Sequence, residues 1–208
     1  MRIFFLFILI FIQPAFSQDE RYFRELFSGE LTQEKRKVQK NYKWMANSPI
    51  YEIDLGSNKF PESLIIEKKD GEDWIHIHDD KKNRIFSFHF DVNGKDSLIY
   101  RISKKRISNI TDLLIIYYYE GNTDYRNFSG SVRLYFLTVD NRDLSTISVY
   151  KGPVYWDERE VPGGKYSQKK YGIELIDFNH DGIMEIAVGG KYLSRVYFYK
   201  SKGRWVGV

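Results

Sequence analysis

The chain has 208 residues, a formal net charge of +4 and no cysteine. The lack of cysteine excludes disulfides, thiolate nucleophiles and cysteine metal sites. The 32 basic residues are interleaved with 28 acidic ones, which is typical of solvated surfaces, so we expect no nucleic-acid partner. The length is enough for one domain with a substantial core.

Residues 1–17, MRIFFLFILIFIQPAFS, have the pattern of a secretory signal. A positive residue precedes the apolar run Ile3–Ile12, and the small residues Ala15 and Ser17 suit a cleavage site. The run is short for a bilayer-spanning helix, which needs about 20 residues. We therefore expect a secreted or periplasmic protein without stable membrane insertion after cleavage, and an uncleaved anchor is the alternative. Secretion without cysteine favours a bacterial source.

Residues 18–46 form the one segment with helical periodicity. Apolar side chains recur there at steps of three and four residues: Phe23, Leu26, Phe27, Leu31, Val38, Tyr42 and Met45. We expect an N-terminal helical segment that packs on the side or end of the following domain. A helix that binds a partner, or that belongs to a pro-segment, is the alternative.

From Tyr51 onward the period changes to two, and short strand-like runs alternate with turns rich in Gly, Asn and Asp. This pattern predicts an all-β, mainly antiparallel domain over residues 47–208. The pair Asn93-Gly94 predicts a tight hairpin turn, because both residues tolerate positive φ. Residues 152–170 are the longest stretch without a clear strand pattern, and we expect an exposed loop there.

Two segments of the β domain repeat the same order of features. When they are aligned, Asp54 falls on Asp177 and Glu62 falls on Glu185, and an apolar strand and a Gly turn follow in both. A weaker third copy begins at NITDLLIIYYYEGN. Such recurrence indicates a repeat architecture. About three four-stranded units are fewer than the blades of the smallest propellers, so we expect propeller-like or otherwise stacked four-stranded β-meander units.

The stretch ELIDFNHDGIMEIAVGG, residues 174–190, has the residue types and spacing of a calcium loop. The predicted ligands are Asp177, Asn179, Asp181, the carbonyl of Ile183, and Glu185. Calcium prefers such oxygen ligands, and Gly182 permits the sharp turn that points them inward. We predict a structural calcium ion bound with a Kd of about 10⁻⁴–10⁻³ M, as in extracellular modules. The alternative is an Asx-type turn without metal.

The same loop carries a family resemblance. It differs from an EF-hand because strands flank it and Val188 stands where a bidentate Glu belongs. It resembles the FG-GAP or VCBS-type repeat of β-propeller proteins, including the integrin α-subunit head, whose D-x-[DN]-x-D-G-x-x-[DE] loops join successive blades. The resemblance covers residues 174–190 well, whereas the copy from Asp54 to Glu62 keeps only the first and last acids. It implies structural calcium and contact surfaces on loops, and it supplies no enzyme activity.

Histidines offer a second candidate site. Trp74, His76 and His78 share one face of the run DWIHIH, and a hairpin over residues 79–83 would bring His89 to the same face. Three imidazoles could bind zinc or copper. A polar outer face is the simpler interpretation.

No motif for a nucleophilic serine, a metalloprotease or a phosphate loop is present, and we expect no organic cofactor. The function that we predict is a secreted or periplasmic binding module that contacts a protein or glycan partner through loops such as 152–170. The alternative is a secreted hydrolase or metal enzyme that uses the histidine face or the acids of the Asp157–Glu160 loop. A structural envelope component is a third hypothesis.

Overall fold

The computed structural model describes residues 50–122, 128–161, 165–190 and 194–208. The predicted signal, residues 1–17, and the predicted helical segment, residues 18–46, lie outside these residues. The described part folds into antiparallel β-strands and contains one short 3-10 turn, Leu144–Thr146, and no α-helix. The prediction of a mainly antiparallel all-β domain is confirmed.

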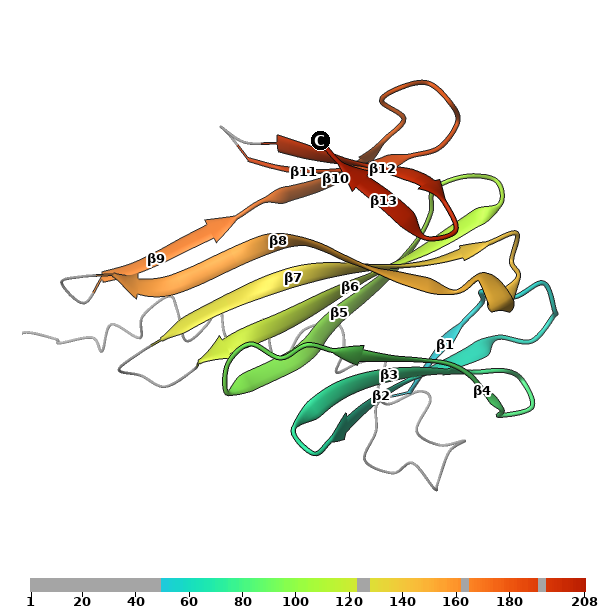
Figure 1. Cartoon of the computed structure of the whole chain (residues 1–208), viewed down its shortest axis with the longest axis horizontal. Coiled ribbons are helices and arrows are strands. Elements are labelled where there is room, and N and C mark those ends of the chain that lie inside the picture. The colour runs from blue at the N-terminus through green and yellow to red at the C-terminus, as the bar shows by residue number, and fades with distance from the viewer. Residues whose placement is uncertain (1–49, 123–127, 162–164, 191–193) are drawn as a thin grey trace, which may run out of the picture.

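The strands form three sheets, each a meander in which a strand pairs with its neighbours in sequence. Sheet A contains β1 (Ile50–Ile53), β2 (Glu62–Lys69), β3 (Glu72–His78) and β4 (Arg84–Phe90). Sheet B contains β5 (Asp96–Arg106), β6 (Thr111–Asn122), β7 (Ser129–Asp140), β8 (Ser148–Val161) and β9 (Lys165–Lys170). Sheet C contains β10 (Gly172–Ile176), β11 (Glu185–Gly189), β12 (Ser194–Ser201) and β13 (Arg204–Gly207). Figure 1 shows sheet B between the other two.

The central strand β6 explains why the sheets stack. It is buried over TDLLIIYYYE, because alternate side chains face two different cores. One core packs Leu114, Ile116 and Tyr118 against sheet A, and the other packs neighbouring residues such as Leu113 and Ile115 against sheet C. The described strands therefore form an open stack of three layers, in which sheet B has five strands instead of the expected four.

The prediction of an exposed loop over residues 152–170 is wrong, because β8 and β9 occupy most of this range. Gly152 and Pro153 looked like loop residues, yet they fall where the β8 register shifts between the pairs Arg133↔Val154 and Tyr135↔Lys151. A bulge leaves residues without ladder partners, so it accommodates a proline that has no N–H to donate.

The predicted hairpin at Asn93-Gly94 is also wrong. β4 pairs with β3 and β5 pairs with β6, so this turn carries the chain from sheet A to sheet B. Gly94 has a φ of +125°, and a Cβ there would collide with the Gly121 backbone. Asn93 and Gly94 do lie in a turn between two strands. The local sequence does not show whether such a turn joins two paired strands or two separate sheets.

Candidate functional site

Three of the predicted calcium ligands converge in the loop between β10 and β11, residues 177–184. The N–H of Asp181 donates to Asp177 Oδ1 and to Asn179 Oδ1, at 3.1 Å in each case. The Asn179 side-chain amide donates in turn to Asp181 Oδ2 at 3.0 Å. Asp177 Oδ1 and Asn179 Oδ1 share one donor and therefore lie close to each other. The oxygen ligands of one calcium ion also lie close together, because each is held about 2.3–2.6 Å from the ion.

The same loop also stabilises its own backbone. Asp177 Oδ2 accepts from the N–H of Gly182 at 3.1 Å, and Asp181 Oδ1 accepts from the N–H of Ile183 at 2.8 Å. Gly182 has a φ of +82°, and His180 one of +59°, as the tight turn requires. These Asx-type bonds match the metal-free alternative. They leave acceptor capacity for an ion, because each carboxylate oxygen has two lone pairs.

Glu185, the last predicted ligand, contacts the backbone of the same loop. It is only 1% exposed, and its Oε2 accepts from the N–H of Phe178 at 2.7 Å. Glu185 therefore fixes the base of the loop. Within the described ranges, no three acidic, His or Cys side chains are grouped to hold a metal; the converging set has two carboxylates and an amide.

Sheet A contains the counterpart of this arrangement. Glu62 is fully buried, and its Oε2 accepts from the N–H groups of Leu55 and Gly56 at 2.8 and 3.1 Å. Glu62 pairs with the last residue of β1 as Glu185 pairs with the last residue of β10. The predicted equivalence of these two glutamates is therefore confirmed. Asp54, in contrast, pairs with the guanidinium of Arg142.

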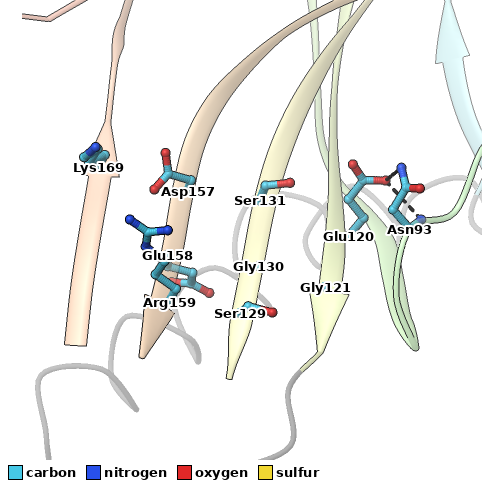
Figure 2. A pocket seen from close by; sticks show the side chains of 10 residues that line it. All are labelled: Asn93, Glu120, Gly121, Ser129, Gly130, Ser131, Asp157, Glu158, Arg159 and Lys169. Carbon is cyan, nitrogen blue, oxygen red and sulfur yellow. Dashed lines mark hydrogen bonds between the residues drawn. The ribbon is translucent and has the colours of Figure 1, made fainter. Parts of the chain in front are cut away.

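A groove of about 480 Å³ lies on sheet B toward one end of β6, β7, β8 and β9 (Figure 2). Its wall includes a row of cross-strand neighbours: Glu120 opposes Ser131, Ser131 opposes Asp157, and Asp157 opposes Lys169. Apart from Asp157, the sequence pattern does not predict this row, because only the strand register brings such distant positions together. A glycine pair, Gly121 and Gly130, flattens the floor.

Glu120 is held in place at one side of the groove. Its Oε2 accepts from the backbone N–H and the side-chain amide of Asn93, at 3.2 and 3.1 Å (Figure 2). Its Oε1 lies 4.0 Å from Arg133 Nε. A buried carboxylate fixed in this way is ready to accept hydrogen bonds from a ligand without losing side-chain entropy.

The acids of the predicted Asp157–Glu160 loop lie on strand β8. Successive strand residues point to opposite faces. Asp157 therefore belongs to the groove row, whereas Glu158 lies on the face of Trp156 and is buried there. Glu160, two residues further along β8, shares the face of Glu158. Asp157 and Glu158 both line the groove.

The predicted histidine face of sheet A is confirmed. The ring of Trp74 lies 4.9 Å from that of His89 and 6.0 Å from that of His76. His78, two positions along β3, points the same way, and its Nδ1 lies 3.1 Å from the carbonyl of Lys82.

Each of the other two imidazoles also has a partner of its own. His76 contacts Ser87 Oγ through Nδ1 at 2.8 Å and Glu67 through Nε2 at 3.1 Å, and His89 Nε2 lies 3.4 Å from Glu72. Burial lowers the pKa of His76. His76 and His78 therefore act as hydrogen-bonded polar groups, whereas Nε2 of His89 is buried and makes no hydrogen bond in the described part of the chain.

No protein-family model, curated protein or solved structure matches the chain. Among the described residues, no helix is long and apolar enough to span a bilayer. The resemblance of residues 174–190 to an FG-GAP or VCBS-type loop stays a prediction. The geometry of the loop and of the groove is what supports a function.

Proposed function

We propose that this chain is a secreted or periplasmic β-repeat binding module, in which the loop over residues 177–185 holds a structural calcium ion and the groove on sheet B binds a glycan. The repeat units would be of FG-GAP or VCBS character and propeller-like in their stacking. The convergence of Asp177, Asn179 and Asp181 around one backbone N–H is the observation that carries the calcium proposal.

The residues of the loop fit calcium in their chemistry. All the converging acceptors are oxygens, the ligands that a hard cation prefers. Calcium would supply positive charge between Asp177 and Asp181, whose carboxylates otherwise repel each other. Its role would be structural, because it would tie together a loop that at present depends on hydrogen bonds to exposed side chains.

The groove suits a neutral, hydroxyl-rich ligand. The described residues that line it are polar or glycine, so no hydrophobic side chain lines the groove. Carboxylates and hydroxyls can accept bonds, and Arg159 and Lys169 can donate them. Neighbouring strands present these groups about 4.8 Å apart. Glycans carry closely spaced groups that both donate and accept.

Isothermal titration with calcium tests the metal proposal. The purified chain should bind one calcium ion with a Kd of about 10⁻⁴–10⁻³ M. Asp181→Ala should abolish the binding, and Asp80→Ala, in the exposed turn before β4, should leave it unchanged. An absence of binding to the unmodified chain at millimolar calcium would refute the metal site.

Electrophoresis through gels that contain soluble xylan, mannan or β-glucan tests the groove. At least one polysaccharide should retard the unmodified chain, and Asp157→Ala should restore its mobility. The same Asp80→Ala variant is the control. Equal mobility in every gel, or equal retardation of Asp157→Ala, would contradict glycan binding at the groove.

A further inference from the structure

A second cavity, of about 390 Å³, lies where the chain passes from sheet B to sheet C. β9 pairs with β8 only over Trp156–Val161, so among the described strands the first half of β8 has a free edge. Tyr150 and Lys151 both line the cavity, although neighbouring strand residues point to opposite faces of a sheet. The cavity therefore lies at this free edge, and Arg195 and Tyr197 of β12 line it from sheet C. We call it the edge pocket.

The edge pocket adjoins the groove of Figure 2. Asp157 lines both of them. Arg133, which also lines the pocket, has its Nε 4.0 Å from Oε1 of the groove residue Glu120. Nη1 of Arg133 donates to the carbonyl of Gly152, at the β8 bulge, at 2.9 Å. A ligand that runs along the groove past Asp157 would therefore reach the edge pocket.

The lining of the edge pocket differs from that of the groove because it includes aromatic rings. Three tyrosines line it: Tyr150, Tyr171 and Tyr197. Tyr197 is buried in the core, whereas Tyr150 and Tyr171 are half-buried. A Cβ on Gly190 would lie 3.5 Å from Tyr171 Cδ1, so the glycine backbone supports one side of this ring. A ring supported in this way presents a flat surface to a ligand at a low cost in entropy.

Two arginines supply hydrogen-bond donors to the edge pocket. Arg195 is exposed and forms no ion pair within the described part of the chain. Arg133 keeps free N–H groups, because a guanidinium carries five. Lys151, in contrast, is paired with Asp91 at 2.9 Å. Since Asp157 offsets part of the remaining positive charge, the pocket suits hydroxyl groups better than a free anion.

We propose that the glycan bound by the groove continues into the edge pocket, where one sugar ring stacks on Tyr171 and accepts hydrogen bonds from Arg133 and Arg195. This inference rests on the proposed glycan binding of the groove. A pyranose ring has a face of C–H groups and a rim of hydroxyls, which match an aromatic ring and guanidinium donors. A cavity lined by aromatic side chains with a few polar groups is the usual form of a small-ligand site.

Electrophoresis of the full chain through gels that contain xylan, mannan or β-glucan tests the edge pocket by substitution. In the gel that retards the unmodified chain, Tyr171→Ala should weaken binding roughly tenfold. Tyr171→Phe keeps the ring and should bind as the unmodified chain does. Arg195→Ala, at an exposed position, should also weaken binding. Lys200→Ala is the matched control, because Lys200 is an exposed cation on the same strand that does not line the pocket.

Isothermal titration with oligosaccharides of the same polysaccharide gives a second measurement. The affinity of the unmodified chain should rise with oligosaccharide length until the groove and the edge pocket are both filled. Tyr171→Ala should bind the shortest oligosaccharides that the groove holds as the unmodified chain does, and should lose the gain in affinity that longer ones bring. A merely structural role of Tyr171 would instead weaken binding equally at every length.

The outcomes separate the edge pocket from the groove. Retardation that Asp157→Ala abolishes, but that Tyr171→Ala and Arg195→Ala leave unchanged, would keep the groove and refute the pocket. Equal weakening by Tyr171→Phe and Tyr171→Ala would refute stacking on the ring. An unmodified chain that no polysaccharide retards would refute both proposals.

Discussion

The loops 54–61 and 177–184 have the same place in sheets A and C, yet they are held in different ways. Both begin with an aspartate and end before a buried glutamate that accepts backbone N–H bonds from the start of the loop. Asp177 turns inward to the loop backbone, whereas Asp54 turns outward to Arg142. The buried glutamate is therefore common to both loops, whereas of the two aspartates only Asp177 bonds the backbone of its own loop.

The largest effects should come from the two shared glutamates. Glu62→Ala should lower the free energy of unfolding by about 3 kcal/mol, since it leaves two buried N–H groups without an acceptor. Glu185→Ala should lower it by about 2 kcal/mol or less, since it leaves one part-buried N–H group without an acceptor. Glu62 accepts two such bonds and Glu185 one. Urea unfolding measures both. Glu62→Gln keeps an acceptor oxygen and should cost less. Alanine variants as stable as the parent would show that the loops do not depend on these carboxylates.

The two aspartates should differ when no calcium is present. Asp177→Ala removes the acceptor of the Gly182 N–H and one of the two acceptors of the Asp181 N–H, and should cost about 1 kcal/mol, as the loss of a helix cap does. Asp54→Ala removes a solvent-screened ion pair and should cost about 0.5 kcal/mol or less. Urea unfolding in EDTA compares them. Equal losses would mean that the inward and outward arrangements are energetically the same.

A smaller effect, on the pH dependence of stability, should come from His76 in sheet A. Burial holds the pKa of His76 below its ordinary value of 6.5, so the unfolded chain binds more protons than the folded one as the pH falls through 6.5. This contribution to stability is complete above pH 6.5 and declines below it. His76→Gln should reduce the loss of stability between pH 7.5 and pH 5.5. An unchanged pH profile would mean that other groups cause the loss.

Sequence reasoning succeeded where the determinants are local or periodic. The spacing of Glu62 and Glu185 predicted equivalent positions, and strand alternation placed the histidines on one face. It failed where distant strands meet. The row from Glu120 to Lys169 exists only through the register of β6 to β9. Gly152 and Pro153 looked like loop residues because a bulge uses the same residue types as a turn.

Thermal unfolding in EDTA and in millimolar calcium tests most directly whether the two loops differ in metal binding. A ligand that binds only the folded state stabilises it by about 1.4 kcal/mol at ten times its Kd. Calcium should therefore raise the melting temperature of the unmodified chain and of Asp54→Ala, and should leave that of Asp181→Ala unchanged. An unmodified chain that melts at the same temperature in both buffers would show that residues 177–185 form only a hydrogen-bonded turn.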